Sequence, residues 1–468
     1  MQLFNTLTRN KENFAPGDKK SVSIYTCGLT VYSQPHIGNW VSYIYWDVLI
    51  RTLKAQGLSV NRVQNITDVG HLVSDDDDGE DKMEKGARNE SITAWDVAEK
   101  YIQIADKEAY EQLGLLRPDH MPRATDYIDE QINFIKQLEA KDTSYTYEIP
   151  GDGIYFDTSK LPDYGKLARL DIEGLEAGKR VENQQKRNKT DFALWKFSPK
   201  GVKRDMEWES PWGVGFPGWH LECSVMAREL LGDTIDIHTG GVDHIPVHHT
   251  NEIAQSEALT SQPFARVWLH NNHLLVDGKK MSKSLGNIYT LQDIQDKGYD
   301  LAAFKLLILS SHYQTSGNFT WEIMDAAQNS LNNLRAFADL MHQPKSSVKS
   351  WLKDMDNISE FSKALFDNLH TPYALSLLSG LSVQAQERLL NEEDISSLKT
   401  FLSEVDSLLG FDLSSREDIS EQQKTMLTRR EEARSKKDWE TSDKLRAQLL
   451  HMNIELRDTP HGQVWHRK

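Results

Sequence analysis

Residues 21–53 read SVSIYTCGLTVYSQPHIGNWVSYIYWDVLIRTL, and their hydrophobic pattern changes halfway along. The β-branched run at 22–26 predicts a buried strand that ends just before Cys27. Beyond Pro35, apolar side chains recur at steps of four, three and four residues, which predicts a helix with one face made of Ile37, Val41, Ile44 and Val48. His36–Asn39 therefore opens a helix at the edge where an open α/β sheet binds ligands, and a helix start attracts phosphate.

Size and composition indicate a globular protein of several domains. The 468 residues allow about two to four domains, and 38% hydrophobic with 26% charged residues is typical of chains with a large core. The sequence holds no apolar run of transmembrane length and no signal-type stretch, so we expect a cytoplasmic protein that does not enter membranes. The net charge of −16 argues against a surface that is basic overall, although a local basic groove is sufficient for nucleic acid.

The strand–turn–helix pattern returns in a later part of the chain. Strands are predicted at 60–66, 234–238 and 267–270, and helices at 91–113, 124–138 and from His248 onward. Between about 140 and 205 the chain is rich in Gly, Pro, Asp and Lys, which is typical of an insertion. Two strand–turn–helix units separated by an insertion predict an α/β fold with a split Rossmann-type parallel sheet.

A few polar residues have the right chemistry for a metal. Cys27 and Cys223 are the only two cysteines, which argues against a disulfide scaffold. Both are expected at strand or turn ends near one edge of the sheet. With Glu252 and either His248 or His249, which share a helix face with it, they would fill a tetrahedral zinc site. From spacing alone, the simpler interpretation is that the two histidines are ordinary residues at a helix start and that the two thiols are buried core groups.

Two motifs suit a nucleotide. His36-Ile37-Gly38-Asn39 places an imidazole and an amide at a helix start, and Gly38 permits close backbone approach. The loop Lys280-Met281-Ser282-Lys283-Ser284 carries two cations and two hydroxyls, which suits a loop that closes over a triphosphate. The acidic run at 74–81 lacks the spacing that wraps an ion, so we interpret it as a solvated loop.

Beyond about residue 300 the pattern is almost wholly helical, and from Glu421 the chain becomes charged. A basic-rich helix pair at 427–446 and a short hairpin at 454–465 are predicted. The charges are interpreted as a solvated face or as an RNA contact, with the two equally supported. The candidate RNA contacts are Arg429, Arg434, Trp439, Arg446, Asp458 and Trp465.

Together these motifs resemble those of a known family. His-Ile-Gly-Asn followed by Lys-Met-Ser-Lys-Ser is similar to the two signatures of class I aminoacyl-tRNA synthetases, and the detail resembles the cysteinyl-tRNA synthetases. The matching stretches are YTCGLTVY (25–32), PHIGN (35–39), NITD (65–68), DFALWK (191–196), PGWHLECSVM (217–226), HTGGVD and HHTNEIAQSEA (within 238–258), KKMSKSLGN (279–287), RSKKDWETSDKLR (434–446) and DTPHGQVW (458–465). They extend over nearly the whole chain.

The resemblance implies an activity. ATP, with Mg²⁺, and L-cysteine react to cysteinyl-adenylate, and the aminoacyl group then passes to the 3′-terminal adenosine of tRNA(Cys). It also implies a monomer of five segments: 1–125 and 206–300 as the halves of the catalytic domain, 126–205 as the connective insertion, 301–410 as a helical bundle, and 411–468 as a small mixed anticodon-binding domain.

The resemblance assigns roles residue by residue. A zinc ion that binds the substrate thiolate takes ligands matching Cys27, Cys223, His248 and Glu252. The amino-acid pocket matches Thr67, Trp219 and Asp243, with Asp243 as the partner of the substrate ammonium, and the residues that match ATP contacts are His36, Gly38 and Lys283. Lys280 belongs to the second signature. Asn39 stands where the first signature usually has a second histidine, which leaves the role of that position open.

Two alternatives to tRNA charging remain at this point. A related ligase joins activated cysteine to an amino-sugar acceptor, and an inert paralogue would act as an RNA-binding protein. The C-terminal tail at 421–465 favours tRNA over the amino sugar, and the intact loop and ligand set argue against an inert protein.

Overall fold

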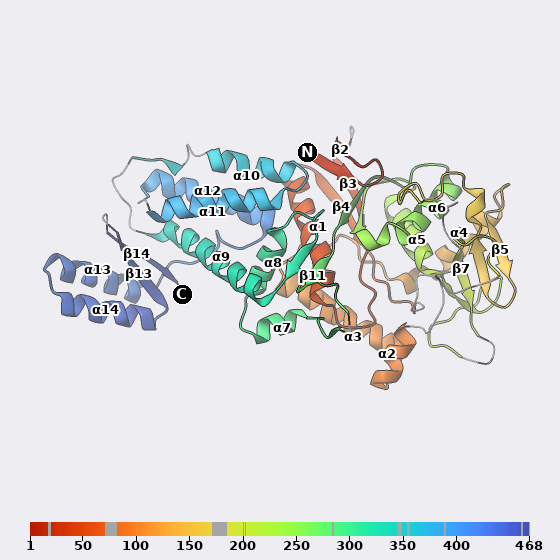
Figure 1. The fold of residues 1–468 in the computed structure, drawn as a ribbon, viewed down its shortest axis with the longest axis horizontal. Coiled ribbons are helices and arrows are strands. Elements are labelled where there is room, and N and C mark those ends of the chain that lie inside the picture. The colour runs from red at the N-terminus through yellow and green to blue at the C-terminus, as the bar shows by residue number, and fades with distance from the viewer. Residues whose placement is uncertain are drawn as a thin grey trace.

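The computed structural model describes residues 1–16, 20–70, 82–170, 185–199, 201, 203–282, 285–343, 349–352, 356–387, 390–459 and 462–467. Its elements follow one another along an elongated molecule, with the C-terminal helices at one end and a small sheet at the other (Figure 1). The central sheet lies between them. The acidic run at 74–81 and Lys283 lie outside the described residues.

The central sheet is parallel and has the strand order β10-β9-β3-β4. Its strands are β3 (Ser21–Thr26), β4 (Ser59–Gln64), β9 (Ile235–Gly241) and β10 (Ala265–Asn271). The predicted strands and the α/β class are therefore confirmed. Because β3 pairs with β9, the two halves of the split domain form one sheet. Asp236 Oδ2 accepts hydrogen bonds from the Ser23 amide at 2.9 Å and the Ser23 hydroxyl at 3.0 Å across this junction.

The helix that follows β3 is buried on almost every side. Helix α1 (Ile37–Ala55) places the predicted face, with Ile44 and Val48, in the core, and it buries Trp40 and Trp46 as well. It packs on the sheet and also against α8 (Leu301–Leu309) and α12 (Glu392–Leu409). A helix covered in this way needs no polar face, which explains its continuous run of apolar and aromatic residues.

Two further helices cover the sheet. Helix α6 (His248–Thr260) begins as predicted, whereas α5 (Trp219–Leu231) begins before Cys223. The expectation that both cysteines lie at strand or turn ends is wrong for Cys223, which lies inside α5. The reason is Gly218, whose extended backbone forms the N-cap directly after a short strand. A Cβ on Gly218 would lie 2.0 Å from the Ala193 carbonyl oxygen, so this close approach requires glycine.

The insertion forms its own antiparallel sheet at one end of the molecule. Its strand order is β5-β6-β7-β8, with β5 (Thr146–Ile149), β6 (Gly153–Phe156), β7 (Phe192–Phe197) and β8 (Gly215–Pro217). Helix α4 (Ile128–Glu139) packs beside it, and Phe156, Phe192 and Trp195 contribute to a separate core. Strand β8 lies beyond residue 205, so the sheet of the insertion draws its last strand from the segment expected to follow it.

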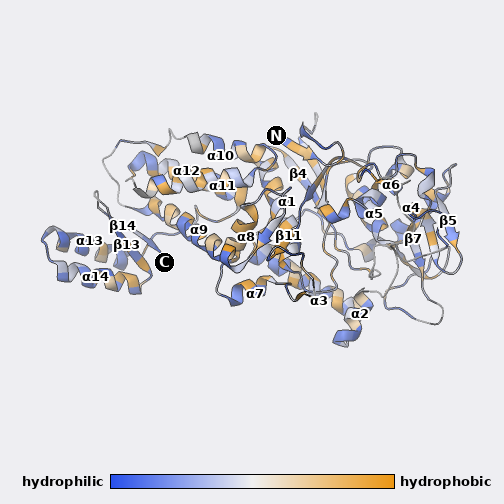
Figure 2. Ribbon diagram, viewed as in Figure 1, coloured by the Kyte–Doolittle hydropathy of each residue, from blue (hydrophilic) through white to orange (hydrophobic). Residues whose placement is uncertain are grey.

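The remainder of the chain is mainly helical, as predicted. The helical bundle contains α9 (Trp321–Asp339), α10 (Asp356–Phe366), α11 (Thr371–Glu387) and α12. The predicted C-terminal helix pair and hairpin are confirmed as α13 (Glu421–Ser435), α14 (Trp439–His451), β13 (Ile454–Thr459) and β14 (Gly462–Arg467). Figure 2 shows α8 as mostly hydrophobic and α13 and α14 as mostly hydrophilic, which fits their central and outlying positions.

The smaller elements complete the fold. They are β1 (Gln2–Asn5), β2 (Asn10–Asn13), α2 (Lys82–Glu90), α3 (Ala94–Asp106) with a π-helical turn at 107–112, short 3-10 turns, β11 (Leu274–Val276), α7 (Leu291–Asp296) and β12 (Gly317–Phe319). The helices at 91–113 and 124–138 are thereby confirmed. Among the described residues, no helix is long and apolar enough to cross a membrane.

Candidate active site and metal centre

A cleft of about 480 Å³ lies at the carboxyl ends of the central strands. Both signature motifs and the expected amino-acid pocket line it. The predicted residues in its wall are Cys27, His36, Gly38, Asn39, Thr67, Trp219, Cys223, Asp243, His248 and Lys280. The sheet edge chosen from the pattern of residues 21–53 is therefore the edge that carries the cleft.

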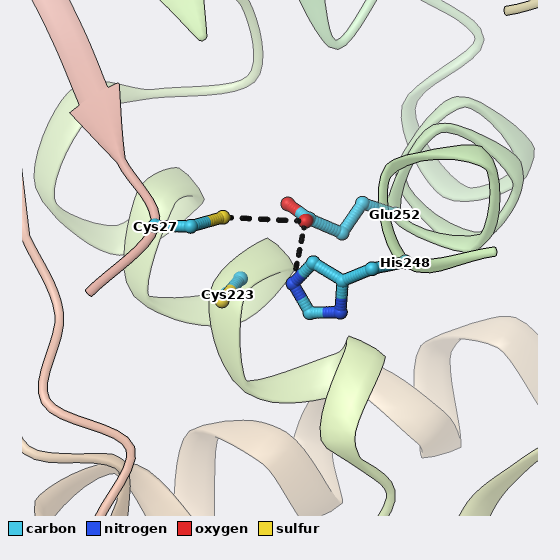
Figure 3. Close-up of side chains that lie close together, drawn as sticks. All are labelled: Cys27, Cys223, His248 and Glu252. Carbon is cyan, nitrogen blue, oxygen red and sulfur yellow. Dashed lines mark hydrogen bonds and ion pairs between the residues drawn. The ribbon is translucent and has the colours of Figure 1, made fainter. Parts of the chain in front are cut away.

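Four buried side chains from three segments meet beneath this cleft (Figure 3). Cys27 directly follows β3, Cys223 comes from α5, and both His248 and Glu252 come from the first turns of α6. One ligand atom of each lies within 4.8 Å of the others. Glu252 Oε1 is 2.9 Å from His248 Nε2 and 3.9 Å from Cys27 Sγ. These are two thiols, an imidazole and a carboxylate, the donor types that zinc takes.

A second set of potential ligands overlaps the first. Cys27 and Glu252 also lie within 4.8 Å of His238 and His249. His249 Nε2 is 3.2 Å from Cys27 Sγ, and its Nδ1 is 2.7 Å from His270 Nε2. His238 Nε2 is 2.9 Å from Glu252 Oε2, so each oxygen of this carboxylate faces a different histidine. Only the first set includes both cysteines.

The electrostatics of the first set favour a cation. A hydrogen bond with Cys27 lowers the pKa of Cys223 to about 6, whereas burial raises the pKa of the Cys27 thiol. Burial opposes ionisation of Glu252, but His238 and His248 hold its pKa well below the usual range. Burial alone would lower the pKa of His248, yet Glu252 and Cys223 raise it to about 10. Cys223 and Glu252 are thus favoured as buried anions, and the proton on His248 balances one of these two negative charges.

The expected amino-acid pocket lies beside this cluster. The Trp219 and His248 rings lie 4.3 Å apart between centroids, so the indole covers the imidazole. Thr67 is held in place because its hydroxyl accepts a hydrogen bond from Asn65 Nδ2 at 3.0 Å. Asp243 is at the mouth, with 70% of its side chain exposed and Oδ2 3.2 Å from His273 Nδ1. Its carboxylate is open to a cationic group in the cleft.

The first signature is a self-capped helix start. The His36 amide donates to Asn39 Oδ1 at 2.9 Å, and the His36 side chain faces the third helical amide in return. Asn39 thus has a structural role at the position where the family's usual histidine is replaced. Burial lowers the pKa of His36, which favours the neutral imidazole at pH 7.

The second signature lies directly against the first. The Ile37 amide donates to the Tyr289 carbonyl oxygen at 2.8 Å, and Gly38 faces Met281. Asn287 stabilises the loop from within: its Oδ1 accepts from the Ser282 amide at 2.9 Å, and its Nδ2 donates to the Lys280 carbonyl oxygen at 3.2 Å. Lys280 is exposed within reach of the cleft.

Sequence reasoning missed two groups of supporting residues. His238 contacts Glu252 and His270 contacts His249 beside the candidate metal cluster, and the signal for both was a polar side chain inside an otherwise apolar strand. Asn65 was also missed, although it precedes Thr67 in a matched motif. Its Oδ1 accepts from the Gly28 amide at 2.8 Å, so it fixes the turn that follows Cys27.

The candidate RNA contacts lie in very different environments. Trp439 is 55% exposed, with the Arg434 guanidinium carbon 5.8 Å from its ring centroid. Arg429 is exposed, Arg434 pairs with Asp458 at 3.1 Å, and Arg446 donates to the Leu456 carbonyl oxygen at 3.2 Å.

Trp465 requires a correction. Its side chain is 2% exposed and packs in the core of the C-terminal unit with Leu449, Ile454 and Leu456. A ring buried in this way has no free face for a base, so the prediction that Trp465 contacts RNA is wrong. Trp465 instead supports the hairpin that presents Asp458.

Comparison with known proteins agrees with this site. A family model described as tRNA synthetases class I (C) catalytic domain matches residues 13–329, and one described as cysteinyl-tRNA ligase anticodon binding domain matches residues 416–465. Cysteine–tRNA ligase 1 of Burkholderia lata is 43% identical over 99% of this chain and 96% of its own. Cysteine–tRNA ligase of Anoxybacillus flavithermus is 39% identical over 100% and 99%.

The fold is also similar to that of solved structures. Mycobacterium tuberculosis methionyl-tRNA synthetase in complex with methionyl-adenylate aligns with a TM-score of 0.60 at 15% identity, over 84% of this chain and 92% of that one. This likeness supports the fold alone. With the two family models and the full-length relatives, it follows that the chain belongs to the cysteine–tRNA ligase family of class I aminoacyl-tRNA synthetases.

Proposed function

We propose that the protein activates L-cysteine with ATP to cysteinyl-adenylate and transfers the cysteinyl group to the 3′-terminal adenosine of tRNA(Cys). The observation that carries this proposal is the convergence of two thiols, an imidazole and a carboxylate beside the two nucleotide signatures in one cleft. We also propose that it acts as a cytoplasmic monomer, with the segment roles and limits set out from the sequence.

Cys27, Cys223, His248 and Glu252 are proposed to hold one zinc ion. Their donor types and buried negative charge support this metal. When bound, zinc supplies a Lewis-acidic centre that favours the thiolate of the substrate cysteine. This matters because an apolar pocket discriminates weakly between near-isosteres such as cysteine, serine and alanine.

The neighbouring residues are proposed to hold the rest of the amino acid. Asp243 is proposed to pair with the substrate ammonium, since its carboxylate is exposed at the mouth of the cleft. Trp219 and Thr67 are proposed to form the walls between this group and the metal cluster. They orient the substrate carboxylate, which is already a nucleophile and needs no general base.

The two signatures are proposed to bind ATP with Mg²⁺. His36 and Gly38 offer an imidazole and an open backbone at a helix start, where the dipole favours phosphate. Lys280 and Lys283 are proposed to stabilise the charge that develops on the phosphates during adenylation. Asn39 is proposed to act indirectly, because its cap holds His36 in position.

The C-terminal unit is proposed to bind the anticodon arm. Trp439 offers an exposed ring for stacking with Arg434 beside it, and Arg429 and Arg446 add positive charge to the same helix pair. Asp458, which pairs with Arg430 and Arg434, is proposed as an acceptor for a base edge. The match of residues 416–465 to an anticodon-binding family model supports this assignment and favours tRNA over an amino-sugar acceptor.

Cysteine-dependent exchange of pyrophosphate into ATP, followed by transfer to tRNA(Cys), tests the proposal. Both activities are expected. Exchange without transfer to tRNA points to the amino-sugar ligase, and no exchange with purified, folded protein rejects both enzymes and leaves the inert RNA-binding paralogue. Exchange with serine in place of cysteine serves as the specificity control.

A further inference from the structure

The end of α9 carries a buried carboxylate that holds the C-terminal unit in place. Asp339 is fully buried, and its two oxygens accept four hydrogen bonds. Arg416 donates through Nε at 2.9 Å and Nη2 at 3.0 Å, and Arg467 donates through Nη1 at 2.9 Å and its backbone amide at 3.3 Å. These two arginines come from opposite ends of the C-terminal unit, because Arg416 lies just before α13 and Arg467 ends β14. One carboxylate therefore holds both ends of the C-terminal unit.

The next turn of the chain reinforces this contact. Gln343 Nε2 donates to the Trp465 carbonyl oxygen at 2.9 Å, and Gln343 Oε1 accepts from the Trp465 amide at 3.2 Å. His342 Nε2 lies 2.8 Å from the carbonyl oxygen of Arg416, in the segment that leads into α13. These hydrogen bonds hold the edge of β14 and the segment before α13 against the helical bundle.

A groove of about 230 Å³ lies along the same junction. One wall is α9, with Asn332 and Asn333, and the other is the hairpin, with Arg457, His466 and Arg467. The relative angle of these walls depends on the Asp339 contacts. An RNA that binds both the bundle and the C-terminal unit needs them in a fixed relative orientation. The Asp339 contacts provide that orientation.

We propose that Asp339 is a positioning residue for tRNA: its contacts with Arg416 and Arg467 fix the orientation of the C-terminal unit that the tRNA requires. This inference rests on the proposed tRNA charging. Replacing one partner of a buried ion pair leaves the remaining charges uncompensated. A smaller fraction of the molecules would then keep the C-terminal unit docked against the helical bundle. A tRNA that binds only that arrangement then binds more weakly by the same factor.

Asp339→Asn tests this role, because it keeps the shape of the side chain and removes its charge. If the docked fraction falls to about one tenth, the KM for tRNA(Cys) rises about ten-fold while kcat and cysteine-dependent exchange stay unchanged. Amide hydrogen exchange at residues 462–467 should accelerate. Asp339→Glu, which restores the charge, should recover part of the loss.

Glu360→Gln is the matched control, since it removes an exposed ion pair with Lys363 in the same helical bundle. It should change neither KM nor hydrogen exchange. Faster hydrogen exchange with an unchanged KM for tRNA would overturn the proposal, and so would a parallel loss of cysteine-dependent exchange, which indicates general unfolding. If the unmodified protein charges no tRNA, the proposed function fails, while the hydrogen-exchange comparison still decides whether Asp339 fixes the C-terminal unit.

Discussion

Gly38 lies directly against Met281, so a residue of the first signature touches a residue of the second. A Cβ on Gly38 would lie 2.2 Å from Met281 Cε and 3.1 Å from His36 Cε1. The absence of a side chain at Gly38 therefore determines how closely the loop at 280–282 approaches the start of α1. The proposed adenylation would require groups from both sides of this contact in fixed geometry.

Gly38→Ala is expected to lower cysteine-dependent exchange about ten-fold, or ~1.4 kcal/mol in activation free energy. Stability should change by less than about 1 kcal/mol, because Met281 Cε is the end of a flexible side chain that can move aside. Exchange rates and urea unfolding measure the two effects. The double variant with Met281→Ala should recover activity relative to Gly38→Ala, and strict additivity of the two substitutions would show that the contact is unimportant.

The adjacent histidines of α6 give a direct test of the metal ligands. His248→Gln should lose both the metal and cysteine activation, whereas His249→Gln should keep the metal with weaker affinity, by about 10- to 100-fold. Elemental analysis of the purified variants measures occupancy. The reverse pattern would assign the metal to the second set, with His238 and His249. Cys223→Ser separates the sets independently, since only the first includes Cys223.

The buried Lys305 predicts a specific dependence of stability on pH. Its Nζ lies 3.8 Å from Asp47 Oδ2 and donates to the Gly410 carbonyl oxygen at 3.2 Å, where α12 ends. Burial lowers the pKa of Lys305 from 10.5 to about 8, against the opposing effect of Asp47. Between these two values the unfolded chain binds more protons than the folded one, so the contribution of Lys305 to stability rises with pH.

Lys305→Met removes this titration. From about pH 7 to about pH 10, the free energy of unfolding of the natural protein should gain up to about 3 kcal/mol relative to the variant. Urea unfolding of both proteins across this range gives the difference, in which other titrating groups cancel. A difference that is constant with pH would mean that Lys305 stays protonated in the folded state.

Replacing each of the two tryptophans of the C-terminal unit should affect a different property, tRNA charging in one case and stability in the other. Trp439→Ala removes an exposed ring and should weaken tRNA charging, by about 1–3 kcal/mol, with exchange and stability unchanged. Trp465→Ala removes a buried ring and should destabilise the C-terminal unit by about 3–5 kcal/mol. Charging kinetics and thermal unfolding distinguish them. Equal loss of exchange and charging in Trp439→Ala would indicate damage to the fold instead.

The elements that carry their own pattern were predictable from the sequence. The change from a β-branched run to a helical period placed β3 and α1 correctly, and with them Cys27 and His36–Asn39. Cys223 was placed on the wrong side of a helix start because Gly218 is a weak N-cap signal, and its need for glycine comes from Ala193 on β7. Local sequence does not contain that contact.

Residue roles that depend on tertiary packing could not be predicted from the sequence alone. His248 and His249 both share a face with Glu252, and both are buried near Cys27, so spacing cannot separate them. The burial of Trp465 depends on α14 covering one face of the hairpin, which alternation along β14 does not specify. Family resemblance predicted one of the two ligand sets, the one with His248, yet it gave no sign that Trp465 is internal.

The pairing of β3 with β9 also determines the order in which the protein can mature on the ribosome. Ser23 and Asp236, which meet across that pairing, are 213 residues apart. At about 5–20 residues per second, Asp236 is made about 10–40 s after Ser23. Until residues 223–252 are translated, the set Cys223, His248 and Glu252 is incomplete and Cys27 lacks its full group of partner ligands; strand β9 is made within the same stretch. The Cys27 thiol stays without its full set of partners until the last segment of the site is translated, so the proposed metal could be bound by all four residues only at a late step of biogenesis.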